Sequence, residues 1–212
     1  MLEYATINEI QLRFPTPVLV KTWPRAATYN TELKRLIQEK RQKDSGVTLS
    51  NRGGWQSRDD FFEWEGEAVD RLSRWVGRCI NQIYLTYHRE AFAQMLEKAQ
   101  GQLPRKLAGW ANVNGRGQWN SPHNHPNCHW SGCYYVQVPE GAGRIAFLDP
   151  RFGVNMQDTG NNLIDLFQQC PQEVAPGDGV TVIFPSWLQH YVTEHGGNED
   201  RISIAFNWRF LP

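Results

Sequence analysis

Two histidines separated by one residue, His123 and His125, are the side chains of this sequence best suited to bind a metal. They lie in the stretch WANVNGRGQWNSPHNHPNCHWSGCYY, residues 110–135. On an extended strand, side chains two positions apart point to the same face, so both imidazoles can reach one ion. Neutral imidazole suits Fe(II), Zn(II) and Cu(II), and a third ligand usually comes from a distant strand. Because an HxH pair is common by chance, the pair alone does not establish a site.

A second cluster follows in FPSWLQHYVTEHGGNEDRISIAFNW, residues 184–208. His190 begins one β-like run, Arg201 begins the next, and Ser203 shares a strand face with Arg201. If these runs pair as antiparallel strands, His190 and Arg201 both point into one barrel. A buried guanidinium needs a partner, and a carboxylate fits its fork of donors; Ser203 can donate one more hydrogen bond to that carboxylate. The pattern therefore describes a metal with three imidazoles and, beyond it, a receptor for an organic acid.

The first part of the chain, about residues 1–104, is expected to be a helical layer with one edge strand. Prolines at positions 15 and 17 confine the strand predicted over residues 12–20 to a sheet edge. A helix is predicted from a cap at Thr28 or Asn30 to about Lys43, because apolar residues recur there at helical spacing. The Gly-rich segment 50–62 is predicted to be a loop.

Residues 65–99 carry a long apolar stripe and are predicted to be mainly helical, with a break near residues 87–90. From about residue 105 to 212, short β-like runs alternate with Gly, Pro and Asn turns, which favours an antiparallel sandwich or barrel over βαβ units. Residues 151–176 form a long polar insertion, a candidate for the part that sets specificity. A chain of 212 residues suits a single domain.

The balance of 22 basic and 22 acidic residues gives no net charge, so neither nucleic acid nor an anionic membrane is an expected partner. No apolar run approaches the roughly 18 residues of a membrane span, and the first residues do not resemble an export signal. The four cysteines are irregularly spaced, which favours free thiols in a reducing compartment. We therefore expect a cytoplasmic protein; its oligomeric state is open, with a homodimer among the alternatives.

The motifs HxHP, SGxYY, FPSWLxH and RxSxxFN together resemble the Fe(II)/2-oxoglutarate-dependent oxygenase superfamily, and within it a family of 2OG-Fe(II) oxygenases. The earlier segments SNRGGWQS and FPTPV also fit, so the resemblance covers nearly the whole chain. It implies a double-stranded β-helix, the jelly-roll of cupin-like barrels, with one iron in its mouth. It also implies that 2-oxoglutarate chelates the iron with its far carboxylate on Arg201 and Ser203, and that Tyr135 hydrogen-bonds this cosubstrate.

The activity implied by the resemblance is hydroxylation of an unactivated C–H bond by dioxygen, with release of succinate and CO2. The substrate class stays open between a small molecule, an amino acid and a peptide. Trp110, Asn112 and Asn114 alternate on one face of a β-like run and either line the substrate mouth or pack the barrel. Arg151 is a candidate contact for an acidic substrate group.

One position departs from the superfamily pattern, whose ligands are two histidines and a carboxylate in the order HxD/E…H. His125 stands where that carboxylate is expected. Either it binds the iron as a third imidazole, or it turns away and leaves a position open for water, substrate or a halide. We favour ligation and expect His123, His125 and His190 to be the metal ligands and catalytic residues.

Three other functions remain open at this point. A cupin-like dioxygenase on a similar barrel would use oxygen without 2-oxoglutarate, and Arg201 would then have no cosubstrate to hold. An oxidative halogenase requires that His125 does not coordinate the metal. A catalytically silent barrel would bind a ligand or a partner without using His190.

Several remaining residues have simpler interpretations. His129 and His195 are expected in turns, the latter exposed to solvent, and His88 is expected at a helix end or surface. Cys133, like Cys128, is expected to be a small core thiol, because the spacing does not fit a zinc site. Trp55 either folds over the site or anchors the helical layer.

Overall fold

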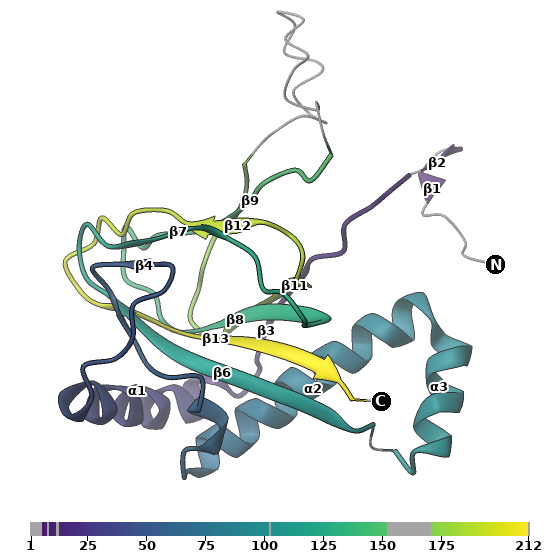
Figure 1. The fold of residues 1–212 in the computed structure, drawn as a ribbon, viewed down its shortest axis with the longest axis horizontal. Helices are drawn as coiled ribbons and strands as arrows, with labels where there is room; N and C mark the ends of the chain where they lie inside the picture. The colour runs from purple at the N-terminus through teal and green to yellow at the C-terminus, as the bar shows by residue number, and fades with distance from the viewer. Residues whose placement is uncertain (1–5, 8, 12, 102, 152–170, 212) are drawn as a thin grey trace, which may run out of the picture.

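The computed structural model describes residues 6–7, 9–11, 13–101, 103–151 and 171–211. Two antiparallel sheets face each other, and helices lie on the outer side of one of them (Figure 1). A separate ribbon pairs β1 (Thr6–Ile7) with β2 (Ile10–Gln11). The predicted mainly-β jelly-roll with a helical layer is therefore confirmed.

The larger sheet has the order β3-β11-β8-β13-β6-β5. Its strands are β3 (Leu19–Thr22), β11 (Val180–Pro185), β8 (Trp130–Gln137), β13 (Arg201–Phe210), β6 (Arg105–Asn114) and β5 (Trp55–Gln56). The smaller sheet has the order β10-β9-β12-β7-β4. Its strands are β10 (Gln172–Val174), β9 (Ile145–Phe147), β12 (His190–Val192), β7 (Trp119–His123) and β4 (Asn51–Arg52).

Strand β13 shows how the larger sheet separates two interiors. Its even-numbered residues from 202 to 208 are buried in the core between this sheet and the helices. On an extended strand the odd-numbered residues point the other way, and Arg201 and Ser203 line a cavity between the sheets. Strands β8 and β11 alternate likewise: Tyr134 packs toward the helices, whereas Tyr135 packs between the sheets. Site residues and core residues therefore alternate along the same strands.

The helical layer consists of α1 (Ala26–Lys43), α2 (Glu67–Tyr87) and α3 (Arg89–Lys98), with a short 3-10 turn, η1 (Phe61–Glu63), before α2. Figure 1 shows α1 and α2 running beneath the larger sheet. The apolar stripe predicted for residues 65–99 is the buried face of α2, and the predicted break falls at His88, between α2 and α3. None of the described helices is long and apolar enough to cross a membrane.

Three boundaries differ from the predictions. The edge strand β3 begins at Leu19, later than predicted, and pairs with β11 through residues 19–22. Helix α1 begins at Ala26 without a side-chain cap, because the chain already turns at Trp23, whose carbonyl accepts the N–H of Ala26 at 3.0 Å. The segment predicted as a loop over 50–62 contains β4 and β5, each two residues long, at one edge of each sheet.

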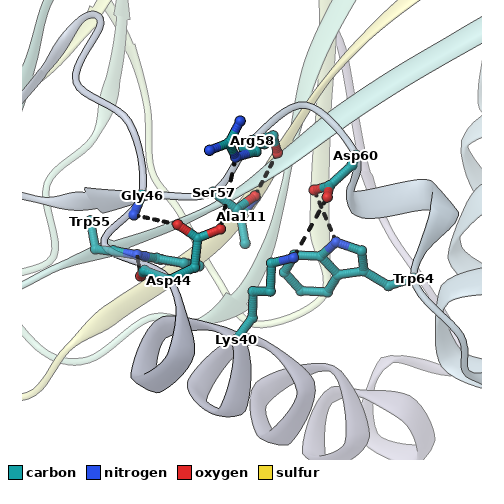
Figure 2. Close-up of polar contacts among 9 residues, drawn as sticks. All are labelled: Lys40, Asp44, Gly46, Trp55, Ser57, Arg58, Asp60, Trp64 and Ala111. Carbon is teal, nitrogen blue, oxygen red and sulfur yellow. Dashed lines mark hydrogen bonds and ion pairs between the residues drawn. The ribbon is translucent and has the colours of Figure 1, made fainter.

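Polar contacts hold this segment against α1 and β6, as Figure 2 shows. The indole Nε1 of Trp55 donates to the carbonyl of Asp44 at 2.8 Å, at the C-terminus of α1. Ser57 Oγ accepts the N–H of Ala111 on β6 at 3.0 Å. Trp55 therefore anchors the helical layer, which was one of its two predicted roles.

Most of the insertion predicted over residues 151–176 lies outside the described residues, so its role in specificity stays a prediction. Of the cysteines, Cys79, Cys128 and Cys133 are free thiols, and Cys170 lies outside the described residues.

One buried hydrogen bond joins the helical layer to the larger sheet: Trp75 Nε1 on α2 donates to Thr181 Oγ1 on β11 at 2.8 Å. Thr181→Val keeps the shape but leaves the buried indole N–H unpaired, so we expect a loss of about 1–3 kcal/mol in unfolding free energy. In a Trp75→Phe background the same change should cost close to nothing, because the donor is gone. Urea unfolding of the four proteins measures the coupling, and equal costs in both backgrounds would contradict it.

Candidate functional site

Three histidines meet between the two sheets. Antiparallel pairing of β12 with β7 sets His190 opposite His123. His125 lies just past the end of β7, where its N–H donates to the carbonyl of Ser186 at 2.9 Å. The ring centroids are 4.4 Å apart for His123 and His190, 4.9 Å for His123 and His125, and 5.2 Å for His125 and His190.

One nitrogen from each ring lies within 4.8 Å of the other two. Metal–nitrogen bonds of about 2.1 Å keep two imidazole ligands of one ion within about 4.2 Å of each other. The rings are therefore already close to the spacing of ligands around one ion. His125 faces the other two imidazoles instead of turning away from them.

All three imidazoles are held neutral. Burial lowers the pKa of His190 to about 3, with a further contribution from His123, and burial lowers the pKa of His125 to about 4. The pKa of His123 is also lowered by burial. Nδ1 of His123 donates to the carbonyl of Ser121 at 2.7 Å, and Nδ1 of His190 donates to the carbonyl of Leu188 at 3.0 Å. Both rings therefore present an unprotonated Nε2, which is the form that binds a metal.

A buried guanidinium lies in the same cavity as the imidazoles. Arg201 is 2 % exposed, and its Nη1 donates to Ser203 Oγ at 3.1 Å and to Asn114 Oδ1 at 3.4 Å. Its guanidinium carbon lies 5.0 Å from the ring centroid of Tyr135. In the described part of the chain, no carboxylate forms an ion pair with Arg201.

Two buried polar atoms of this region have no hydrogen-bond partner among the described residues: Nε of Arg201 and the hydroxyl of Tyr135. Burial raises the pKa of Tyr135, so its hydroxyl stays protonated and can donate. An unpaired buried cation and unpaired buried donors are costly unless a ligand supplies acceptors. An anion with oxygen acceptors satisfies all of them, which is what the carboxylate of 2-oxoglutarate offers. The three neutral nitrogens likewise fit Fe(II).

The cavity opens into a groove of about 620 Å³ on the outer side of the histidines. Trp110, His123 and His125 line both the cavity and the groove. The outer groove is otherwise formed largely by residues 47–59. A ligand on Arg201 and a second ligand in the groove would therefore both lie next to His123 and His125.

The residues that were predicted to contact the substrate do not all lie in one place. Trp110, Asn112 and Asn114 share the inward face of β6, as predicted, but only Trp110 reaches the outer groove, whereas Asn114 contacts Arg201. Arg151 is exposed and binds its neighbour Asp149, with Nη2 2.5 Å from Oδ2. Arg151 is not among the residues that line the cavity or the groove, so its contact with substrate stays a prediction.

His195 is not the solvated turn residue that we predicted, since it is 1 % exposed. The turn after it folds back so that Gly196 N–H donates to the carbonyl of Gly141 at 2.9 Å, and this contact could not be read from the sequence. His129 lies outside the histidine cluster, and its Nδ1 accepts the N–H of Phe210 at 3.3 Å. His88 is exposed at the end of α2, as predicted.

Two residues of the site were missed by the sequence analysis. Cys133 lines the cavity, and burial raises the pKa of its thiol beside Arg201 and Ser203. Asn207 lies in the outer groove against His125. The alternation of side chains along a strand could have identified both residues. Cys133 lies on the same strand face as Tyr135, and Asn207 lies on the same strand face as Arg201 and Ser203.

Comparison with known proteins gives a match to the family described as "Putative 2OG-Fe(II) oxygenase" over residues 108–207. No curated protein gives a significant sequence match.

Several solved structures share the fold. A prolyl-4-hydroxylase from Pseudomonas putida is 13 % identical with a TM-score of 0.61, covering 93 % of this chain and 94 % of that one. The non-heme alpha ketoglutarate dependent carbocyclase SnoK of nogalamycin biosynthesis is 11 % identical with a TM-score of 0.60, covering 91 % of this chain and 79 % of that one. HygX from Streptomyces hygroscopicus, solved with nickel and 2-oxoglutarate, is 12 % identical with a TM-score of 0.51, covering 92 % of this chain and 83 % of that one.

At such low identity the structural likeness establishes the fold. The sequence match covers 100 of the 212 residues, 108–207. The matched segment contains the three histidines, Arg201 and Ser203. Fe(II) and 2-oxoglutarate are the cofactors of that family. Residues 108–207 of this chain match the family described as 2OG-Fe(II) oxygenases.

Proposed function

We propose that this protein hydroxylates an unactivated C–H bond of a small molecule, amino acid or peptide. In this proposal His123, His125 and His190 hold Fe(II), and Arg201 with Ser203 and Tyr135 holds the far carboxylate of 2-oxoglutarate. The observation that carries it is the buried guanidinium of Arg201, which shares a cavity with three neutral imidazoles and has no carboxylate partner among the described residues. The cofactors supply the oxidation: dioxygen and 2-oxoglutarate give succinate and CO2, and one oxygen atom goes to the substrate.

The side chains have separate tasks in this reaction. Arg201 orients the cosubstrate carboxylate by an ion pair, while the Ser203 hydroxyl and the protonated Tyr135 each donate a hydrogen bond to it. The apolar ring of Phe184, 4.5 Å from His190 between ring centroids, helps to exclude water from the ligand atoms. Trp110 lies where the cavity meets the outer groove, and we assign the groove to the substrate. Exclusion of water directs the oxidation to the bound substrate.

The rival functions make different use of the same residues. A cupin-like dioxygenase without 2-oxoglutarate gives no reason for the unpaired donors around Arg201. A halogenase needs an open coordination position, and His125 faces the position that would have to be open. A silent binding barrel does not need three neutral imidazoles at ligand spacing.

The cofactor assignment is tested by anaerobic titration of metal-free protein with Fe(II) and then 2-oxoglutarate, following the weak visible charge-transfer band of the chelated 2-oxo acid. We expect the band in wild type and its loss in Arg201→Met at matched 2-oxoglutarate, with Fe(II) still bound. Arg116→Met removes an exposed arginine on the turn after β6 and should leave the band unchanged.

Each other outcome selects a different function. Iron binding without the band in wild type would favour the cupin-like dioxygenase, and no iron binding would favour the silent barrel. Loss of iron from His125→Ala would support the third imidazole as a ligand. A chlorinated product that requires chloride would replace hydroxylation by halogenation.

The lowered pKa values make a second prediction. Protons compete with a metal only when they can bind the imidazoles, and the pKa values of His125 and His190 are about 4 and about 3. Lowering the pH from 7.5 to 5.5 should therefore raise the Fe(II) dissociation constant by less than about tenfold, because only His123, whose pKa is lowered from its ordinary value, can gain a proton in this range. Three imidazoles at the ordinary pKa of about 6.5 would lose about a thousandfold in affinity over this range.

Anaerobic competition titration at each pH measures this dissociation constant, and circular dichroism at pH 5.5 controls for unfolding. A fall in affinity of a hundredfold or more with the fold intact would show that the imidazoles are not held neutral.

A further inference from the structure

His125 differs from the other two imidazoles in the partner of its Nδ1. The Nδ1 atoms of His123 and His190 face main-chain carbonyls, which can only accept, so those two rings are protonated at Nδ1. Nδ1 of His125 instead lies 3.5 Å from the amide nitrogen of Asn207. An amide has a donor end and an acceptor end, so the end that faces His125 decides which nitrogen of that ring carries the proton.

The amide of Asn207 belongs to a chain of hydrogen bonds that runs into the core. Ser131 Oγ lies 2.7 Å from the oxygen of the Asn207 amide and 2.9 Å from Ser186 Oγ. Both serines are 1 % exposed, and Ser131 is the cross-strand partner of Asn207 between β8 and β13. The carbonyl of Ser186 also accepts the N–H of His125, so the chain returns to the same histidine through the main chain.

Two arrangements of this chain make the same contacts. With the amide nitrogen toward His125, it donates to Nδ1, the imidazole proton moves to Nε2, and that atom has no lone pair for a metal. A half-turn of the amide places its oxygen against His125, which then donates from Nδ1. The amide nitrogen donates to Ser131, and the Ser131 hydroxyl donates to Ser186. Only the second arrangement gives His125 the tautomer that His123 and His190 have.

We propose that Asn207 is a positioning residue for His125. Its amide oxygen accepts the Nδ1 proton, with Ser131 and Ser186 holding the amide in this orientation, so that His125 binds the metal where the superfamily has a carboxylate. This inference rests on the proposed function, because it concerns the same metal centre. Its test uses Zn(II), which is diamagnetic and does not depend on turnover.

The tautomer is read directly from two-bond ¹H–¹⁵N spectra of the imidazoles in Zn(II)-loaded, ¹⁵N-labelled protein, with His125→Ala assigning the signals of His125. We expect a protonated Nδ1 and a metal-shifted Nε2 for this ring. A His125 that stays protonated at Nε2 in the zinc-loaded protein would overturn the inference.

Variants of Asn207 test the same point by affinity. Asn207→Leu has a similar size and no acceptor, so the Zn(II) dissociation constant should rise about 10–100-fold. Asn207→Asp keeps an acceptor for the Nδ1 proton and should bind Zn(II) at least as tightly as wild type. Asn198→Asp adds the same charge on the exposed loop before β13 and should leave the affinity unchanged.

Failure of this inference and failure of the proposed function would give different results. Wild-type protein that binds no Zn(II) would overturn the metal centre of the proposed function and this inference with it. Wild-type binding with Asn207→Leu within twofold of it would overturn only the role of Asn207. Should Asn207→Leu fail to fold, the decision falls to the tautomer spectrum and to Asn207→Asp, whose affinity must then not fall below that of wild type.

Discussion

The pairing of β12 with β7 determines whether this chain has a metal centre at all. His190 reaches His123 because the two residues are cross-strand partners, and a slip of one residue would turn His190 to the opposite face of the sheet. The other neighbour of β12 is β9, which brings Phe147 opposite His190, while Phe184 packs on the imidazole from the larger sheet. The packing that places the imidazole also removes it from water and keeps it neutral. Position and protonation state thus have one cause.

The replacement of a carboxylate by His125 changes the charge balance of the whole cavity. A metal dication bound by the three neutral imidazoles would share this cavity with the Arg201 guanidinium, and among the described residues no acid lines the cavity. Low dielectric strengthens the resulting field, so the cavity favours a ligand with negative charge at both ends. A dicarboxylate such as 2-oxoglutarate has that charge distribution. Under the proposed function, the cosubstrate provides the negative charge that the protein does not provide at position 125.

Sequence periodicity was sufficient for the parts of the fold that depend on local pattern. The stripe of α2 and the alternation of RISIAFNW follow from helical and strand periods, and the motif spacing carried the histidine cluster and Arg201. The rest depends on contacts between distant segments. His195 is buried by a turn that meets Gly141, and Trp55 is anchored by the end of α1. Strand period places Asn207 on the same face as Arg201 and Ser203, but its contact with His125 joins distant segments and could not be read from the sequence.

The two sheets are supported unequally, and this divides the work of the site. Helices α1 and α2 back the larger sheet, which carries Arg201, Ser203 and Tyr135 (Figure 1). The histidines come from the smaller sheet and the segment after it, over which no described helix lies. Asn207 on β13 reaches from the supported sheet to His125 and is half-buried beside the open groove. His125, which lies beyond the end of β7, is therefore contacted by a side chain of the helix-backed sheet, whereas His123 and His190 have backbone carbonyls as Nδ1 partners.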